Sequence, residues 1–256
     1  MTLQRHEIDA ITALYQRHQS LRRVGNMLGY SPNTVRKYVQ AHYEIHTQNI
    51  VTSVKTNDDR LIGTYIGLWM GDGTQYISEG SYVVKFCLHA DHNRMVEFIQ
   101  ELLVDLFGKS SHVVKSSIRK RQYVRLYSKF LFKWVEEYTA FSDNKTQTVR
   151  LKDSVSTYST EFIEGCLLGL MLSDGYLKKK ALFNVVSQEL ASDMYSILES
   201  FGYAPQLYVH DRSSHGWNDL HMVSLRVDDS QQLCKQLDVI LTKLGCEWSF
   251  EELKYE

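Results

Sequence analysis

Two aspartates that each end an apolar segment carry the strongest chemical signal of this sequence. Asp72 follows the apolar run 61–71, and Asp174 follows the similar run 162–173. Small residues recur at every fourth position within both runs, which predicts two helices in close backbone contact. Carboxylates at the C-terminal ends of paired helices meet an unfavourable helix dipole and repel one another. Because divalent cations relieve both effects, we expect Asp72 and Asp174 to hold Mg²⁺ beside a phosphate group.

The glycines of these runs indicate where the two helices touch. A glycine inside a helix costs roughly 1 kcal/mol relative to alanine, so its repeated use needs a compensating gain, and close approach of two backbones supplies one. We expect left-handed backbone at Gly73 and Gly175, which follow the aspartates. On the alternative interpretation, each aspartate merely precedes a helix-ending glycine. The expected helix contacts are Gly63, Gly67, Gly165 and Gly169.

The composition is that of a globular chain with a substantial core. The 256 residues are 43% hydrophobic and 12% aromatic with two prolines, which excludes disordered and fibrous classes. No run of 18 apolar residues occurs and residues 1–10 lack a signal-peptide core. We therefore expect no membrane contact and an intracellular protein, in the cytoplasm or nucleoid, or in an organelle of a eukaryotic host. The four cysteines form no C-x-x-C pair, so neither a zinc knuckle nor a disulfide framework is expected.

Charge is distributed unevenly along the chain, although the formal net charge is only −1. The net charges are +3 for residues 1–45, 0 for 46–60, +3 for 61–150 and −7 for 151–256. Eight Lys or Arg residues and no Asp or Glu lie between Leu106 and Val135. This stretch suits a polyanionic partner, although a solvated surface gives the same pattern.

Residues 1–45 are expected to form a small all-α domain. Apolar residues at helical spacing predict a helix over 7–17 and a second helix that Ser20 caps. The turn 29–32 and a further helix follow. This spacing resembles the helix-turn-helix family of DNA-binding domains, whose last helix enters the major groove. A three-helix packing module without DNA contact is the alternative. The expected DNA-reading residues are Asn33, Thr34, Arg36 and Lys37.

The polar, aperiodic residues 46–60 are expected to link this domain to a duplicated region. Residues 61–150 and 151–256 show the same succession of an apolar helix, two strands, a helix, two strands and a final helix. The predicted fold class is therefore α+β, with two pseudo-symmetric αββαββα halves after the small helical domain. Their two antiparallel sheets are expected to form one concave saddle.

Both aspartate runs resemble the motif of a known family. Residues 65–73, YIGLWMGDG, and 167–175, LLGLMLSDG, resemble the LAGLIDADG motif of homing endonucleases. The family's other acidic position is Met70 in the first copy and Leu172 in the second, while both copies keep the later aspartate. Two motifs in one chain resemble the single-chain, pseudo-twofold members of that family, with the helix-turn-helix as an addition.

The resemblance implies a site-specific endonuclease that makes a double-strand break by Mg²⁺-dependent phosphodiester hydrolysis at a long target site. The saddle would lie in the major groove of double-stranded DNA, each half would cut one strand, and Mn²⁺ is expected to substitute for Mg²⁺. Gly71 and Ser173, which directly precede the two aspartates, are expected to join them at the metal. A monomer is expected because the duplicated chain already contains the twofold arrangement.

Basic and polar side chains near the aspartates are expected to position water and stabilise the phosphate. By location, the candidates are Lys85, His89 and Arg125 in the first half and Asn184, Gln188 and Arg226 in the second. The residues expected to contact DNA elsewhere on the saddle are Lys115, Arg119, Lys120, Arg121, Lys178, Lys179 and Lys180.

Two alternatives use the same fold without DNA cleavage. The first is a transcription regulator that binds DNA on a LAGLIDADG-like scaffold, and the second is an RNA-splicing helper. The charge of −7 over residues 151–256 is unusual for a domain that grips a phosphate backbone. Both motif aspartates are present, however, and this favours the endonuclease.

Overall fold

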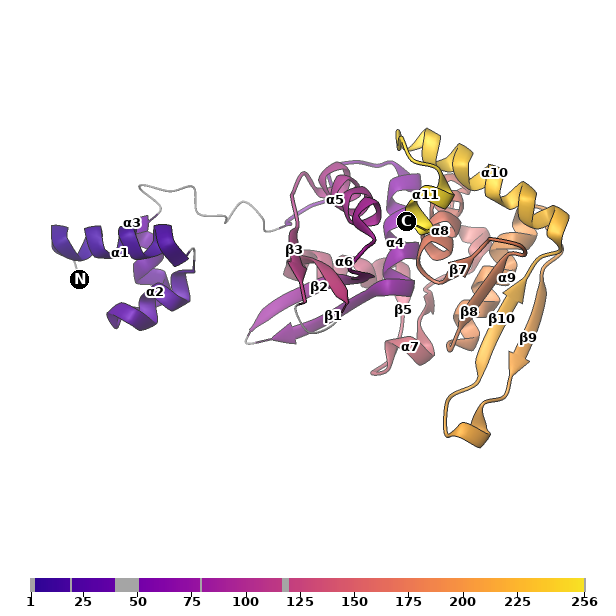
Figure 1. The fold of residues 1–256 in the computed structure, drawn as a ribbon, viewed down its shortest axis with the longest axis horizontal. Helices are drawn as coiled ribbons and strands as arrows, with labels where there is room; N and C mark the ends of the chain where they lie inside the picture. The colour runs from indigo at the N-terminus through magenta and orange to yellow at the C-terminus, as the bar shows by residue number, and fades with distance from the viewer. Residues whose placement is uncertain (1–2, 19, 40–50, 79, 117–119, 256) are drawn as a thin grey trace. The chain divides into compact units, whose positions relative to one another are not determined.

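The chain divides into two compact units, residues 1–49 and 50–256, which we describe separately (Figure 1). The structure, a computed structural model, describes residues 3–18, 20–39, 51–78, 80–116 and 120–255. None of the helices in these ranges is long and apolar enough to cross a membrane.

The N-terminal unit contains α1 (Arg5–His18), α2 (Leu21–Leu28) and α3 (Pro32–Val39). Ser20 caps α2, since its hydroxyl accepts a hydrogen bond from the Arg23 amide at 3.3 Å. Gly29 ends α2 in left-handed backbone with φ 74°, which glycine adopts without strain. The helices enclose a small core of Leu3, Ile11, Tyr15, Val24, Val35 and Val39.

Residues 51–58 differ from the linker expected over 46–60. Val51 is buried in the core of the second unit, and its carbonyl accepts a hydrogen bond from the Ser128 hydroxyl at 2.6 Å. The Lys55 amide donates to the Leu106 carbonyl at 2.7 Å. One apolar side chain and paired backbone groups thus fix this polar segment against the first half. Residues 40–50, which include the start of the expected linker, lie outside the described residues.

The second unit shows the predicted succession of elements twice. The first half comprises α4 (Asp59–Asp72), β1 (Gly73–Ser78), β2 (Ser81–His89), α5 (Asn93–Phe107), β3 (His112–Lys115), β4 (Arg121–Tyr127) and α6 (Lys129–Tyr138). The second comprises α8 (Thr160–Ser173), β7 (Gly175–Tyr176), β8 (Leu182–Val185), α9 (Gln188–Ser200), β9 (Gln206–His210), β10 (Leu220–Ser224) and α10 (Val227–Lys243). The connection contains β5 (Thr139–Ala140), α7 (Lys145–Thr148), β6 (Arg150–Leu151) and the 3₁₀ turn Val155–Thr157, and α11 (Phe250–Lys254) follows α10.

Each half builds one four-stranded antiparallel sheet, which confirms the predicted α+β class. The strand orders are β1-β2-β4-β3 and β7-β8-β10-β9, so the two sheets have the same topology. The sheets lie on either side of the central pair α4 and α8 (Figure 1). Alternate residues of the central strands, such as Val84, Phe86 and Phe183, are buried beneath the helices of their own half.

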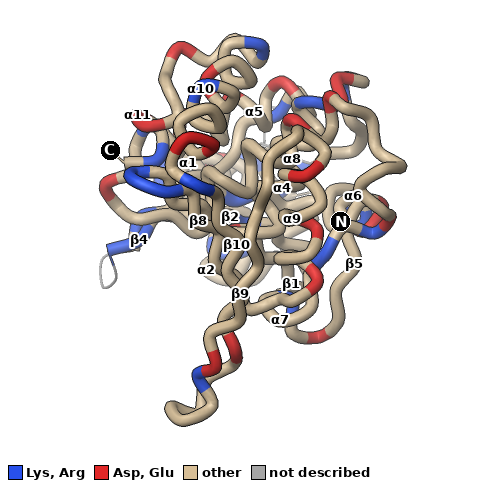
Figure 2. Tube along the Cα trace, turned by 90° about the vertical axis from the view of Figure 1, so that its right-hand side faces the viewer, with Lys and Arg blue, Asp and Glu red and all other residues tan. Residues whose placement is uncertain are grey.

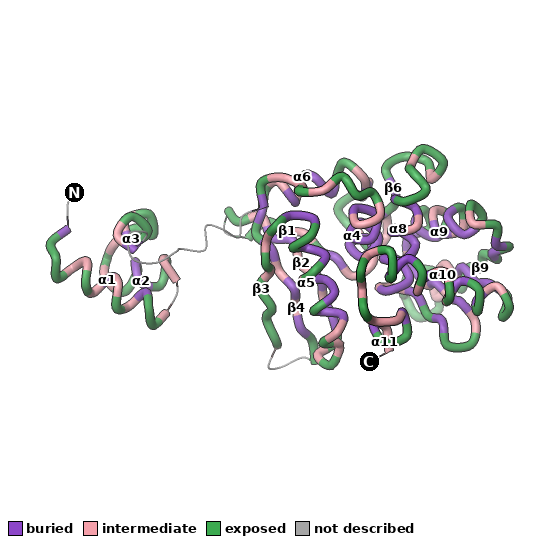
Figure 3. Tube along the Cα trace, turned by 90° about the horizontal axis from the view of Figure 1, so that it is seen from above, coloured by how far each residue is buried: buried purple, intermediate pink, exposed green. Residues whose placement is uncertain are grey.

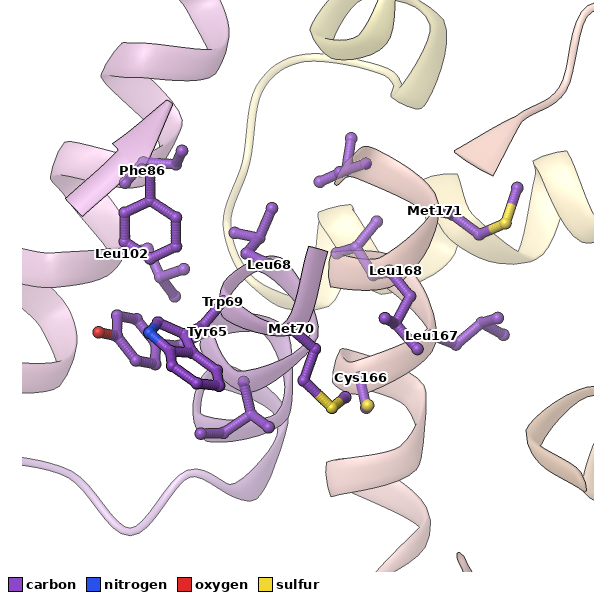
Figure 4. Close-up of a cluster of buried hydrophobic side chains, with 14 of the residues drawn as sticks. Tyr65, Leu68, Trp69, Met70, Phe86, Leu102, Cys166, Leu167, Leu168 and Met171 are labelled. Atoms are coloured by element: carbon purple, nitrogen blue, oxygen red, sulfur yellow. The ribbon is translucent and has the colours of Figure 1, made fainter. Parts of the chain in front are cut away.

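The core is centred on α4 and α8, which are buried along most of their length (Figure 3). Asp58 and Ser159 cap these helices through hydrogen bonds from backbone amides of the first turn. Met70 of α4 and Cys166 of α8 lie side by side between them (Figure 4). At the opposite end from the motif aspartates, the Arg60 guanidinium forms an ion pair with Glu164 at 2.7 Å. Apolar contacts and this pair align the two helices along their length.

Candidate functional site

The crossing of α4 and α8 depends on glycines at the contact. A methyl group added at any of these glycines would come within 2.0–2.3 Å of a backbone carbonyl oxygen of the opposite helix. No side chain fits there, so the helix backbones touch directly. This contact fixes where the two helices end relative to one another. The glycines are Gly63, Gly67, Gly165 and Gly169.

The glycines after the aspartates serve a different purpose from the one expected. Gly73 has φ −76° and ψ 148°, and neither Gly73 nor Gly175 has left-handed backbone, so that expectation was wrong. A methyl group at Gly73 would lie 2.5 Å from the Trp69 carbonyl oxygen, and one at Gly175 would lie 2.6 Å from Cα of Met171. Glycine is needed because each strand leaves tightly against the last helical turn.

The two aspartates meet at the C-terminal ends of these helices. A methyl group at Gly71 would lie 2.8 Å from Asp174 Oδ2 and 2.1 Å from Ser173 Oγ, so the end of α8 lies directly against the end of α4. Asp72 and Asp174 are both half-buried. Burial, and then the charge of Asp174, raise the pKa of Asp72 to about 6. Burial also raises the pKa of Asp174. The carboxylates therefore form a destabilised pair that a cation would relieve.

Two lysines that the sequence analysis missed complete this arrangement. Lys145 Nζ donates hydrogen bonds to the carbonyls of Trp69, Met70 and Gly73 at 2.7–2.8 Å, and to that of Gly71 at 3.3 Å. It thereby caps the C-terminal end of α4 and offsets the helix dipole. Burial lowers the pKa of Lys145 to about 8, and the charges of the two aspartates oppose that effect.

Lys254, the last residue of α11, caps the C-terminal end of α8 in the same way. Its Nζ donates to the carbonyls of Leu172 and Ser173 at 2.8 and 2.5 Å. Burial lowers the pKa of Lys254, again against the pull of Asp72 and Asp174. Both lysines are isolated in sequence, and the available signal was only that each lies near the end of its own half.

A small cavity of about 210 Å³ adjoins the first aspartate. Its lining includes Asp72, His89, Ser173 and Lys254, so residues of both halves meet around it. His89 is thus near the aspartate, as expected, and its Nδ1 lies 3.4 Å from a carboxylate oxygen of Asp91. This cavity could admit water or a phosphate oxygen beside the carboxylate.

The site offers a divalent cation a sparse set of protein ligands. Among the described residues there is no cluster of three or more His, Cys, Asp and Glu side chains that could hold a metal. Mg²⁺ commonly retains waters and binds through one or two carboxylates plus substrate phosphates, so the aspartate pair fits this ion. The expected ligands Gly71 and Ser173 offer carbonyls that accept hydrogen bonds from Lys145 and Lys254, and each keeps a second lone pair.

One face of each sheet is turned away from the helices of its own half, and we call it the open face. On the first sheet Lys85 pairs with Arg125 across β2 and β4 on this face. Lys85 Nζ lies 4.9 and 5.1 Å from the ring centroids of Tyr76 and Tyr123, and Arg125 stacks over Tyr123 at 5.3 Å. These cation–π contacts hold two positive charges on the open face.

Several candidates do not lie where the sequence placed them. Gln188 is the first residue of α9, capped by Ser187, and Arg226 caps α10, so neither lies on a strand of the second sheet. Asn184 is on β8 as expected. Lys115 pairs with Gln122, which is buried, and therefore shares the helix-covered side of the sheet rather than the open face.

The other expected DNA contacts are at accessible positions. Lys120 and Arg121 are exposed at the start of β4, and Arg121 pairs with His89 on the open face. Lys178–Lys180 form the connection between β7 and β8. Arg119 lies outside the described residues. On α3, Asn33, Arg36 and Lys37 are exposed, and Thr34 is half-buried with its hydroxyl 2.8 Å from that of Ser31.

Crossed helices that end in paired aspartates between two such sheets give this chain the fold of the LAGLIDADG homing endonucleases. The chain is similar to the homing endonuclease I-DmoI, with a TM-score of 0.55 and 16% identity over 71% of this chain and 97% of that one. Similarity to I-DmoI in complex with DNA and Ca gives a TM-score of 0.54, with 14% identity over 72% and 91% of the chains. The chain is also similar to the homing endonuclease I-WcaI bound to its DNA recognition sequence, with a TM-score of 0.50 and 13% identity. This match covers 90% of this chain and 97% of I-WcaI.

Sequence comparisons give a more limited result. No protein-family model matches the chain. The ATP-dependent DNA helicase Hel308 of Thermococcus kodakarensis is 27% identical over 151 residues, which are 56% of this chain. The match spans only 13% of the helicase.

Proposed function

We propose that this protein is a site-specific DNA endonuclease that makes a double-strand break by Mg²⁺-dependent phosphodiester hydrolysis. The observation that carries the proposal is the pair of half-buried aspartates, each at the end of a crossing helix that its own lysine caps. The fold, which the chain shares with structures of homing endonucleases on DNA, supports the same conclusion. One chain supplies both aspartates, which favours action as a monomer.

The residues of the site have separable roles in this proposal. Asp72 and Asp174 hold the cation, which when bound polarises a phosphate oxygen and lowers the pKa of water at the scissile bond. Lys145 and Lys254 place fixed positive charge beside the carboxylates, where it stabilises the charge that develops on the phosphate. Lys85 and Arg125 hold the DNA backbone near the first aspartate. Mn²⁺ substitutes for Mg²⁺ because its ligand preferences are similar.

A selection from a randomised double-stranded library tests this function directly. The full chain is incubated with the library in Mg²⁺ or in Ca²⁺, and cut and bound sequences are compared. We expect a long target sequence to be recovered among the cut molecules in Mg²⁺. Enrichment of bound but uncut sequences under both conditions would instead support a DNA-binding regulator on this scaffold, and no enrichment would exclude both.

Replacing either lysine is expected to slow cleavage and to shift its pH dependence. Lys145→Met and Lys254→Met should each lower the cleavage rate by on the order of 10²-fold, as for the loss of one preorganised donor. Both lysines lower the pKa of Asp72, so their removal raises that pKa further. The acidic limb of the pH–rate profile, at limiting Mg²⁺, should therefore move to higher pH. Lys152→Met, at a lysine outside the site, is the control. A slower enzyme with an unshifted acidic limb would show that these lysines only stabilise the fold.

The N-terminal unit is proposed to be a helix-turn-helix domain that adds affinity and part of the sequence preference. Arg36→Ala combined with Lys37→Ala should weaken DNA binding and reduce the salt dependence by about one unit per lost phosphate contact. Deletion of residues 1–45 should also shorten the protected length, while cleavage persists at high enzyme concentration. If the truncated protein binds the full site with the same affinity and footprint, the unit is a packing module.

A further inference from the structure

The two open faces differ in charge although the halves share one topology. Strand register identifies the equivalent positions, because Gly73 pairs with Phe86 as Gly175 pairs with Phe183. The next pair towards the turn contains Lys85 in the first sheet and Leu182 in the second. These two residues are therefore at equivalent positions. A charged position has thus become an aliphatic one.

Positions next to this one also carry neutral residues in the second sheet. Arg125 pairs with Lys85, and Ser224 pairs with Leu182, so a buried serine replaces the arginine. By the same register, Met222 replaces Tyr123. The second open face carries no Asp, Glu, Lys or Arg on its described strands, which present Tyr176, Leu182, Asn184, Gln206, Tyr208, His210, Leu220, Met222 and Ser224.

The positive charge of the second half lies elsewhere. Lys178–Lys180 are in the connection between β7 and β8 and not on the strands that form the open face. In Figure 2 the strands of the β9–β10 hairpin are uncharged, and Asp and Arg residues occur only towards its tip. The second half can therefore contact phosphates from a loop while its strands meet the groove with neutral groups.

The neutral side chains of the second open face include types that recognise particular bases in the major groove. Amide side chains bind adenine, and apolar side chains contact the thymine methyl group. Gln206 and Tyr208 are exposed, and the Tyr208 hydroxyl donates to Gln206 Oε1 at 2.6 Å, which orients that amide. Asn184 is half-buried on β8, and its Oδ1, itself enclosed, has no hydrogen-bond partner within the described residues, so this oxygen gains a partner if the side chain turns towards a base. Met222 lies between them on β10.

We propose that the two sheets read their half-sites by different chemistry: the second sheet selects A·T base pairs through amide and methyl contacts, and the first binds guanines and phosphates through Lys85, Arg121 and Arg125. The charge of the first open face supports its part, because Arg and Lys pair with guanine in the major groove and neutralise phosphates. This inference rests on the proposed binding of double-stranded DNA by the saddle.

A reciprocal pair of substitutions tests the proposal. Lys85→Leu gives the first sheet the residue of the second, and Leu182→Lys does the reverse at an equivalent, half-buried position. Each variant of the full chain is used to select from a randomised duplex library with Ca²⁺ in place of Mg²⁺, and its affinity is measured from 50 to 200 mM salt. Thermal unfolding verifies that both variants fold, and Met222→Ala and Asn184→Ala give a second route to the A·T contacts.

The parent protein should select a target with guanines in one half-site and A·T pairs in the other. Lys85→Leu should relax the guanine preference and lower the salt slope by about 0.9 for a lost phosphate contact. Met222→Ala or Asn184→Ala should leave the slope unchanged and reduce discrimination in the A·T half-site by about fivefold or more. Leu182→Lys should steepen the slope and admit guanine there.

Two outcomes would overturn the inference. One is a selected target whose half-sites have the same base composition, and the other is a loss of salt slope upon Met222→Ala equal to that upon Lys85→Leu. Failure to select any sequence would count against the proposed DNA-binding function itself. The two failures are therefore distinguishable in one experiment.

Discussion

Asp72→Asn and Asp174→Asn are each expected to abolish double-strand cleavage in Mg²⁺ while DNA binding is largely retained. Each aspartate supplies a carboxylate to the cation, and an amide cannot replace its charge. Loss of rate should be on the order of 10³-fold or more, as for removal of a single essential electrostatic group. Cleavage is followed on a selected target, and binding is measured on the same DNA. Normal double-strand cleavage by either variant would eliminate the proposed mechanism.

Asp72→Asn should not destabilise the metal-free protein at neutral pH. The pKa of Asp72 is raised in the folded state from 3.8 to about 6, so the folded protein binds more protons than the unfolded chain between these values. Stability therefore falls as pH rises from about 4 to 6, by up to about 3 kcal/mol at 1.36 kcal/mol per pKa unit. Asp72→Asn removes this penalty. Its melting temperature should match or exceed that of the parent at pH 7, and the advantage should vanish near pH 4.

An exposed aspartate provides the matched control for both measurements. Asp105 lies on the solvent-facing side of α5, far from the helix ends in sequence, and Asp105→Asn changes the same charge. It should cleave normally and show no gain in stability at pH 7. An equal gain in stability for Asp72→Asn and Asp105→Asn would mean that the gain comes from general charge repulsion rather than from the aspartate pair.

Gly67→Leu and Gly169→Leu are expected to lower the free energy of unfolding by several kcal/mol. The added side chain would meet backbone atoms, since even a methyl group would lie 2.3 Å from the carbonyl oxygen of Cys166 or Thr64. Overpacking in a well-packed core typically costs 1–3 kcal/mol, and backbone gives way less easily than a side chain, so about 3 kcal/mol or more is expected. Urea-induced unfolding measures the change.

A leucine placed on the exposed first turn of α8 separates this effect from mere added bulk. Glu161→Leu should leave stability within about 0.5 kcal/mol of the parent. Variants at Gly67 that still fold should also lose cleavage, because the helix ends and their aspartates move apart. If Gly67→Leu melts like the parent, the two helices do not cross at this position.

The sequence was sufficient for the features that depend on local pattern. Hydrophobic periodicity and strand alternation gave the αββαββα order of each half, and the paired aspartate runs indicated both the helix crossing and the acidic centre. The basic residues of β2 and β4 were found from their location on strands that the alternating pattern predicts. Helical periodicity and strand alternation repeat every few residues, so they can be identified from the sequence alone.

Correct identification of the site residues in the second half required the strand register, which cannot be read from the sequence. Asn184 and Arg226 were candidates by location, whereas the strand pairing places Leu182 at the position equivalent to Lys85 and Ser224 at that of Arg125. The reason is the length of the first hairpin, because twelve residues separate the paired Gly73 and Phe86 and only seven separate the paired Gly175 and Phe183. Strand length and turn length set the register together, so distance along the chain from the aspartates does not identify equivalent positions.

Long-range contacts decided the remaining parts of the site. Lys145 and Lys254 carry no local signature, and they belong to the centre only because the end of each half returns to the C-terminal turn of its own first helix. Buried carbonyls at that turn need donors, and a single lysine supplies several. Sequence alone thus determined which carboxylates come together, while the tertiary structure decided which cations meet them, because chain return and strand register are set by packing rather than by neighbouring residues.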